Sequence, residues 1–443
     1  MRVVLLIIIG RRSGLSLATL FVAAALGACG SSSGSNGSSN GDSGTGIEPL
    51  DAAPDASPGD AVADAPVDHG DAGPLADSSI DSGRDAGTDA GVVMRPGYNL
   101  GSGFFVLNGK LYDANGHEFR IRGVDKLHWD NGSPGLASSH ANTVRWNIDF
   151  TQPAANNIAL LQGGAGKTSG TIYDHMAVMP GAWSAPAGTL TCSSDPNMLS
   201  SAVSVWVAQA SSWTQLEKYS IINIGNEWGP SNSTVWRDSY ISAISQLRAA
   251  GYHATLSITS GGCGQDNADL VTYAQAVFDS DPEKNVIFDR HVYGGDADVQ
   301  ALDTDAKALA ALGQVVIFGE FGPGRNIGPS PTNLAPSDVI QTAEKYGFGW
   351  MAWAWDDNNL ANAQADNQWF ALSYTGTYAS SADLTIFGQQ VIEGCTNAAP
   401  GGCGCPDTPA PPMTSVAPGC KGTPAPTYSG NSLEALAVPA TIF

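Results

Sequence analysis

The chain has 443 residues and a formal net charge of −22, because 42 acidic residues stand against 20 lysines and arginines. This balance argues against nucleic-acid binding, which requires a basic face. All eleven tryptophans lie between Tyr98 and Cys395. We therefore expect one folded domain at residues 98–395, rather than the two or three domains that the length alone would allow.

The first 28 residues predict an export signal. Arg11 and Arg12 are followed by an apolar run and by small residues up to the sequence LGAC, which ends at Cys29. This order is typical of a signal peptide and resembles the bacterial lipoprotein box, in which the cysteine is lipidated. We expect an exported protein, as an outer-membrane lipoprotein, at the cell surface or extracellular, that meets the membrane only through a lipid on Cys29. Cleavage at a plain small-residue site is the alternative.

Residues 29–97 predict a disordered acidic linker made almost entirely of Ala, Asp, Gly, Pro and Ser. Between Gly30 and Val93, eleven aspartates and one glutamate are opposed only by Arg84. A segment of this composition cannot bury enough apolar surface to offset its ordering entropy, and its own charge extends it. The folded domain itself is therefore only mildly acidic.

From Tyr98 onward the sequence is that of a globular domain. A hairpin with Asn-Gly turn signals is predicted at residues 103–125. Helical patterns run over residues 195–217, from an Asp195 N-cap, and over residues 233–251. Eight apolar runs alternate with helical patterns, and this predicts a (β/α)8 TIM barrel, for which about 300 residues is a normal length. The runs are residues 119–125, 141–148, 176–183, 219–226, 253–260, 285–293, 314–320 and 349–355.

The carboxyl ends of barrel strands are where catalytic side chains are expected. Glu227 follows the fourth run and Glu320 ends the seventh, and their separation of 93 residues fits three barrel units of about 31 residues. Cleavage of a glycosidic bond requires an acid for the leaving oxygen, a carboxylate for the anomeric carbon and flat rings for the sugar faces. The other polar and aromatic residues at the run ends are Asp125, His128, Arg145, Trp183, Asn226, His291, Tyr293, Trp353 and Trp355.

The motifs at these positions resemble those of glycoside hydrolase family 5, the retaining β-glycanases on a (β/α)8 barrel. INIGNEWG at residues 222–229 is similar to the Asn-Glu strand of the family. HVYGG at 291–295 resembles its His-x-Tyr strand, and VVIFGEFG at 315–322 resembles its nucleophile strand. RGVDKLHWD and GWMAWAW resemble its first and its tryptophan strands.

The resemblance implies a role for each matched residue. Glu227 would be the acid/base, Glu320 the nucleophile, and Asn226 the partner of the sugar 2-hydroxyl, while Arg145 and Tyr293 would bond Glu320. Further substrate contacts are expected from His128, His291, Trp353 and Trp355, with Trp355 as the sugar platform.

A purely structural role remains an alternative for three of these residues, and the end of the third run departs from the family pattern. Arg145 could be a barrel-core ion pair, His291 a hydrogen-bonded core histidine and Trp353 simple core. The third run lacks the histidine that much of the family has there, and Trp183 is the nearest bulky candidate.

The cysteines other than Cys29 number six, an even count that favours disulfides over metal ligands in an exported chain. Six cysteines allow fifteen pairings. We expect Cys192 to pair with Cys263 inside the domain, and the other four to staple the Cys- and Pro-rich tail at residues 396–443. No CxxC pair or histidine cluster has zinc spacing, so we expect neither a metal nor a cofactor.

Three functions fit the sequence. SGGCGQDNADL at 260–270 and SADLTIFGQQVIEG at 381–394 resemble the bacterial β-mannanase branch of the family, which favours a mannan endo-1,4-β-mannosidase. A cellulase of the same family shares every catalytic residue and remains the alternative. A non-catalytic glycan-binding surface lipoprotein would be expected to lose a catalytic carboxylate, and both are present. In each case we expect a monomer whose partner is a polysaccharide.

Overall fold

A computed structural model of the chain describes residues 92–127, 135–162, 171–172, 174–294, 296–323, 334–355, 370–373, 376, 378–379 and 383–394. The predicted signal peptide with Cys29, most of the linker and the tail lie outside these residues, as does His128. Among the helices that are described, none has the length and hydrophobicity needed to cross a membrane.

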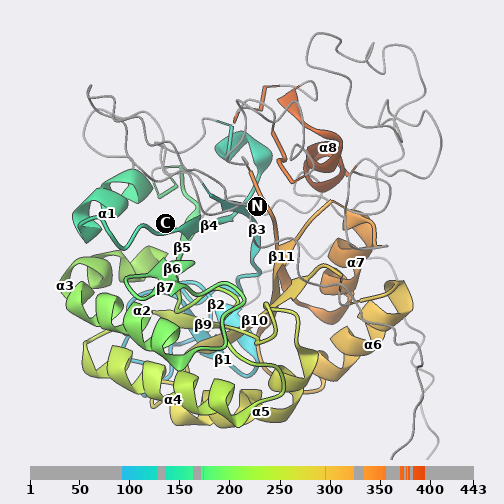
Figure 1. The fold of residues 1–443 in the computed structure, drawn as a ribbon. Coiled ribbons are helices and arrows are strands. Elements are labelled where there is room, and N and C mark those ends of the chain that lie inside the picture. Colours follow the sequence, from blue (N-terminus) through green and yellow to red (C-terminus); the bar gives the residue numbers. More distant parts are fainter. Residues whose placement is uncertain are drawn as a thin grey trace, which may run out of the picture. The chain divides into compact units, whose positions relative to one another are not determined.

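Eight parallel strands close into a barrel with helices on its outside (Figure 1). Each strand overlaps one of the eight apolar runs, so the predicted (β/α)8 barrel is confirmed. In chain order the strands are β3 (Arg122–Lys126), β4 (Thr143–Asn147), β5 (Ala177–Gly181), β8 (Ile221–Asn223), β9 (Thr255–Thr259), β10 (Val286–Val292), β11 (Val316–Phe321) and β12 (Gly349–Ala352).

The helices begin where the sequence predicts. The Asp195 side chain accepts from the backbone N–H of Asn197, and the Ser233 side chain accepts from that of Val235. The predicted helix at 195–217 is, however, divided into α2, α3 and η2. The helices are η1 (Ala137–Ser139), α1 (Ala154–Gln162), α2 (Pro196–Ala208), α3 (Ala210–Trp213), η2 (Thr214–Tyr219), α4 (Thr234–Ala249), α5 (Asn267–Ser280), α6 (Val299–Ala310), α7 (Pro336–Tyr346) and α8 (Ile386–Ile392).

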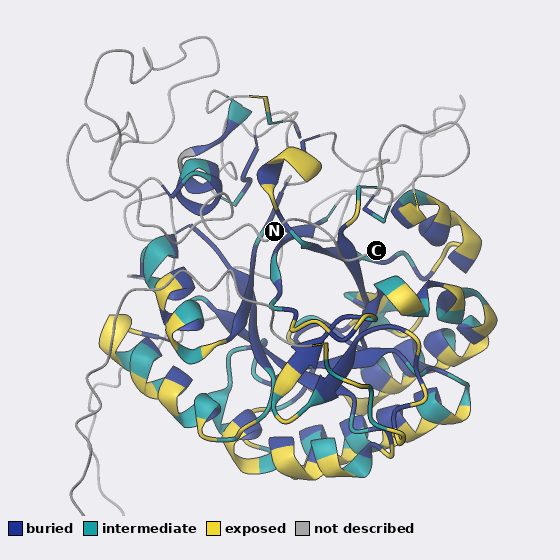
Figure 2. Cartoon of the chain, turned by 180° about the vertical axis from the view of Figure 1, so that it is seen from behind, coloured by how far each residue is buried: buried dark blue, intermediate teal, exposed yellow. Residues whose placement is uncertain are grey.

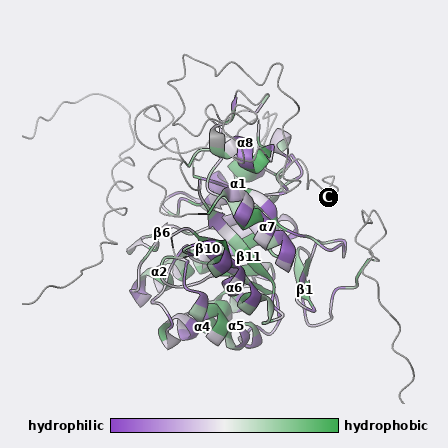
Figure 3. Ribbon diagram, turned by 90° about the vertical axis from the view of Figure 1, so that its right-hand side faces the viewer, coloured by the Kyte–Doolittle hydropathy of each residue, from purple (hydrophilic) through white to green (hydrophobic). Residues whose placement is uncertain are grey.

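Alternate residues of the barrel strands face two different apolar layers, since side chains along a strand point to opposite sides. Val144, Phe288 and Trp350 belong to the layer between the strands and the helices. Ile287 and Met351 belong to a second cluster inside the barrel. The helices expose their outer faces while the strands are buried (Figure 2). Hydrophilic and hydrophobic residues alternate along the helices (Figure 3).

The predicted hairpin closes the N-terminal end of the barrel. Strands β1 (Phe105–Leu107) and β2 (Lys110–Tyr112) pair antiparallel across Asn108 and Gly109, whose φ angles of +52° and +71° suit the two central positions of a type I′ turn. Val106 from this hairpin packs in the cluster inside the barrel.

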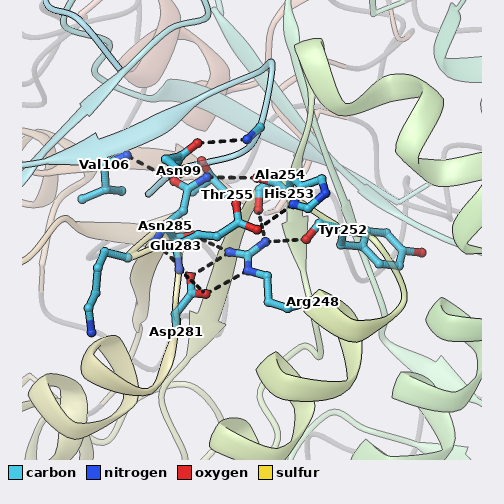
Figure 4. A network of polar contacts seen from close by, with 12 residues as sticks. Asn99, Val106, Arg248, Tyr252, His253, Ala254, Thr255, Asp281, Glu283 and Asn285 are labelled. Carbon is cyan, nitrogen blue, oxygen red and sulfur yellow. Dashed lines mark hydrogen bonds and ion pairs between the residues drawn. The ribbon is translucent and has the colours of Figure 1, made fainter. Parts of the chain in front are cut away.

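Polar contacts secure the same end (Figure 4). Asn285 accepts from the backbone N–H of Val106 at 3.1 Å and from the Thr255 hydroxyl at 2.9 Å. Arg248 forms a two-pronged ion pair with Asp281, at 2.9 and 2.8 Å. The predicted site residues lie at the opposite, carboxyl end of the strands.

Candidate active site

Glu227 and Glu320 come together at the carboxyl end of the barrel. Glu227 lies four residues after the end of β8, and Glu320 lies in β11. One oxygen of each carboxyl and a ring nitrogen of His291 all lie within 4.8 Å of one another. The two glutamates are only 8% and 4% exposed, so both carboxyls are largely shielded from solvent.

Arg145, in β4, holds the nucleophile candidate from across the barrel, because β12 and β3 separate its strand from β11. Its Nη1 donates to Oε1 of Glu320 at 2.7 Å and to Oδ1 of Asp125 at 3.1 Å, and its Nη2 donates to the amide oxygen of Asn226. Asp125 is its direct partner across β3 and β4. Arg145 is fully buried, so these bonds fix the guanidinium and hence the Glu320 carboxylate.

Strand β10 and the residue that follows it supply two further partners, His291 and Tyr293. The register between β10 and β11 shifts between Arg290 and His291, and after that shift His291 stands directly opposite Glu320. Its Nδ1 lies 2.9 Å from Oε1 of Glu227 and 3.4 Å from Oε2 of Glu320. The Tyr293 hydroxyl donates to Oε2 of Glu320 at 2.9 Å. The extra residue is Gly319 of β11, and an irregularity of this kind re-aims a side chain, here that of Glu320 toward His291.

Burial and the neighbouring charges raise the pKa values of both Glu227 and His291. Burial raises the pKa of Glu227 by disfavouring its charged form, and the charge of Glu320 adds to this against the opposing hydrogen bond from His291. Burial alone would lower the pKa of His291, but the charges of Glu320 and Asp289 outweigh it and raise that pKa to about 10. Glu227 is therefore suited to hold a proton, beside an imidazolium that donates to it.

Two buried acids of the site were not assigned a role from the sequence. Asp125 pairs with Arg145, and Oδ2 of Asp289 lies 3.7 Å from Nε2 of His291 while accepting from the Thr259 hydroxyl at 3.2 Å. A signal was available for Asp289, because it precedes His291 by two positions in a strand and must share its face.

Among the described residues, the half-buried indoles at the mouth are Trp183 and Trp353, whose ring centroids lie 5.8 Å apart. The prediction of Trp355 as the sugar platform is wrong. Trp355 is fully buried and its Nε1 donates to the carbonyl of Gly376 at 3.3 Å, so no face of its ring is free for a sugar. The expected substrate contact at Trp353 stays a prediction.

The position of Trp183 explains why the third barrel strand, β5, has no histidine at its end. A Cβ at Gly181, the last residue of β5, would lie 2.7 Å from Cζ3 of Trp183 and 2.9 Å from Oδ1 of Asn223. The guanidinium carbon of Arg145 lies 4.3 Å from the Trp183 ring centroid, a cation–π distance. The indole therefore occupies the space above Gly181 and shields Arg145, where a larger residue in the strand would not fit.

Cys192 and Cys263 form a disulfide in the structure, as the sequence led us to expect. Glu227, His291 and Glu320 are also the one group of ligating side chains in the described part of the chain with the proximity that a metal ion needs. Nδ1 of His291 lies at hydrogen-bond distance from Glu227, and the Tyr293 hydroxyl donates to Glu320. We therefore interpret the three residues as a hydrogen-bonded group.

A barrel with two such carboxyls at its strand ends, and indole rings beside them, defines a class of protein, the glycoside hydrolases. Comparison with known proteins agrees. The sequence profile described as Cellulase (glycosyl hydrolase family 5) matches residues 186–359. A mannan endo-1,4-beta-mannosidase of Salipaludibacillus agaradhaerens is 30% identical over 311 residues, which cover 66% of this chain and 92% of that protein.

A mannan endo-1,4-beta-mannosidase of Streptomyces lividans is also 30% identical, over 58% of this chain and 67% of its own length. Among solved structures, a beta-mannanase from Thermomonospora fusca superposes with a TM-score of 0.54 at 26% identity, covering 66% of this chain and 94% of its own. The chain belongs to glycosyl hydrolase family 5.

Proposed function

We propose that the protein is a retaining endo-β-1,4-mannanase, with Glu320 as nucleophile and Glu227 as acid/base. The observation that carries the chemistry is the approach of both carboxyls to one ring nitrogen of His291, within 4.8 Å. Retaining enzymes hold their carboxyls about 5–5.5 Å apart, whereas inverting enzymes need about 6.5–9.5 Å to admit a water. Support for mannan comes from the relatives named as mannan endo-1,4-beta-mannosidases.

In the first step the Glu320 carboxylate attacks the anomeric carbon while Glu227 gives its proton to the departing glycosidic oxygen. Arg145 and Tyr293 each bond one oxygen of Glu320, so the carboxylate is already oriented before the substrate arrives. The product of this step is a glycosyl ester on Glu320 and a shortened chain with a free hydroxyl.

In the second step Glu227 must act as a base toward water. The charge of Glu320 is one cause of the raised pKa of Glu227, and that charge disappears when the ester forms. The pKa of Glu227 therefore falls when a base is needed, while the adjacent imidazolium of His291 favours its ionised form. Water then hydrolyses the ester with overall retention of the anomeric configuration.

Substrate binding would use the groups around this pair. One N–H of the Asn226 amide donates to Thr191 at 3.1 Å, and we assign the other to the sugar 2-hydroxyl. Trp353 and Trp183 would stack on sugar faces, in place of the buried Trp355.

We also propose that the mature protein is a lipoprotein anchored through Cys29, with residues 29–97 as a spacer and the catalytic domain acting alone as a monomer. Cys29→Ala is expected to move the protein from the detergent phase to the medium or periplasm. Unchanged membrane association of this variant would refute the anchor.

A β-1,4-glucanase is the second candidate, favoured by the description of the matching profile as a cellulase. The test is to incubate the purified protein with galactomannan, carboxymethyl cellulose, xyloglucan and xylan and to analyse the products. We expect fastest cleavage of galactomannan, with the β-anomer formed first by NMR. Fastest cleavage of carboxymethyl cellulose would favour the second candidate, and a first-formed α-anomer would refute retention.

Replacement of each glutamate by alanine is expected to change the activity in a different way. Glu320→Ala should abolish turnover of every glycan, and azide should restore activity with an inverted product. Glu227→Ala should lose about 10²–10⁴-fold on polysaccharide, the usual contribution of acid/base catalysis, but keep cleavage of aryl glycosides whose leaving group needs no proton. Parent-like hydrolysis of polysaccharide by both variants would refute the assignment.

A further inference from the structure

The Cys192–Cys263 disulfide lies against Glu227 rather than in the apolar core. Cys192 belongs to the segment between β5 and α2, and Cys263 lies four residues after the end of β9. The sulfur of Cys192 is 3.9 Å from Oε2 of Glu227. Cys192 is exposed and Cys263 is half-buried, so the bridge is open to solvent at the same end of the barrel as the site.

On one side, the bridge is tied to the backbone that carries the acid/base. The backbone N–H of Cys192 donates to the carbonyl of Glu227 at 3.1 Å. The preceding residue, Thr191, accepts a hydrogen bond from the Asn226 amide at 3.1 Å. Thr191 and Cys192 thus hold Asn226 and Glu227, respectively, by hydrogen bonds.

On the other side, the bridge is tied to the partner of that acid. Gly264, which follows Cys263, accepts the backbone N–H of His291 at 2.7 Å. A Cβ on Gly264 would lie 2.7 Å from Nδ1 of His291 and 3.2 Å from Cγ of Glu227. The Gly264 backbone therefore packs directly on both members of the Glu227–His291 hydrogen bond, and a shift of Cys263 would disturb that bond.

The backbone around the bridge needs such a constraint. Cys192, Glu227 and Cys263 have φ angles of +58°, +51° and +59°, the left-handed region that a Cβ disfavours. Non-glycine residues stay in that region only where the surrounding structure fixes them. Here the disulfide joins two of the three residues, and the N–H of Cys192 bonds the third.

We propose that the Cys192–Cys263 disulfide positions Glu227 for proton donation, in addition to stabilising the fold. The inference rests on the proposed role of Glu227 as acid/base. A bridge that only stabilised the fold would affect all substrates alike. A bridge that aligns the acid affects those substrates whose leaving group needs a proton, because small misplacements of a catalytic group are costly.

The test compares two substrates on the variant Cys192→Ala/Cys263→Ala, well below its unfolding temperature. One substrate is mannan and the other is a dinitrophenyl β-manno-oligosaccharide, whose leaving group needs no proton. The parameter is kcat/KM, because it reports the first chemical step for both. We expect a fall of roughly 10- to 100-fold on mannan and of less than about threefold on the dinitrophenyl substrate.

A matched control separates positioning from stability. Tyr252→Phe removes a buried hydroxyl that donates to the carbonyl of Trp206 at 2.7 Å. Tyr252 precedes the first residue of β9, so it lies at the end of the barrel opposite the site. This variant should also have a lower melting temperature but an unchanged ratio of the two kcat/KM values. An equal fall on both substrates in the disulfide variant, or no fall on either, would overturn the proposal.

Reduction provides the same measurement if the double variant does not fold. Dithiothreitol supplies two electrons and two protons, which convert the exposed bridge to two thiols while the reagent forms its cyclic disulfide. The reduced parent should lose activity selectively on mannan and regain it on reoxidation, and an unselective loss would count against the proposal. A parent that cleaves no glycan would instead refute the proposed function.

Discussion

Replacing Arg145 by lysine tests whether this buried arginine serves the chemistry or only the core. Lysine keeps the positive charge but loses the planar fork, so its single nitrogen cannot replace both Nη1, which bonds Glu320 and Asp125, and Nη2, which bonds Asn226. Hydrogen bonds to charged groups contribute about 1.5–3 kcal/mol each, so the loss of one of these bonds should cost about that much stability. The release of Glu320 from its orientation should lower kcat about 100-fold.

Arg248 offers a matched control at the opposite end of the barrel. It is also a largely buried arginine that bonds a buried aspartate, Asp281, with two nitrogens. Arg248→Lys should lose comparable stability in urea unfolding while its kcat/KM on mannan stays at the parent value. The reasoning would be refuted if Arg145→Lys kept parent kcat, or if Arg248→Lys lost as much activity as Arg145→Lys.

The remaining predictions concern the indoles and the buried charges. Trp353→Ala should raise KM for mannan severalfold with little change in stability. Trp355→Ala should instead cost about 3–5 kcal/mol of unfolding free energy, as buried Trp-to-Ala changes do. The reverse pattern would contradict the assignment of Trp353 to the substrate and of Trp355 to the core. The raised pKa of His291 favours the folded state below the usual value of 6.5 and ceases to do so as the pH rises to about 10. Stability should therefore decline across this interval, and Asp289→Asn should flatten the decline; an unchanged slope would exclude Asp289 as a cause.

The barrel and its two glutamates could be predicted because both follow from simple periodicities. Eight apolar runs alternating with helical patterns require parallel strands, and parallel strands bring their carboxyl ends to one edge. Glu227 and Glu320 therefore had to approach each other, although they are far apart in the sequence. The same logic extends to Asp289, whose spacing from His291 already placed it on the inner face.

Trp353 and Trp355 show where that logic stops. The two residues are two positions apart, and in a continuing strand this spacing would place both side chains on the same face. Strand β12 ends at Ala352, however, and beyond it the direction of a side chain depends on the segments that pack against it. Trp355 donates to the carbonyl of Gly376, a contact that no local pattern could predict.

The disulfide illustrates the complementary case, in which the fold selects among pairings that the sequence leaves open. Cys192 and Cys263 are 71 residues apart, but the fold brings the segment after β5 and the loop after β9 together on the backbone of Glu227. A bridge there joins the segment that supports Asn226 to the segment that supports His291. A change that loosens the segment carrying Gly264, which packs on His291 and Glu227, should therefore act on the same proton transfer, so substitutions at Gly264 should lower activity on mannan more than activity on the dinitrophenyl substrate.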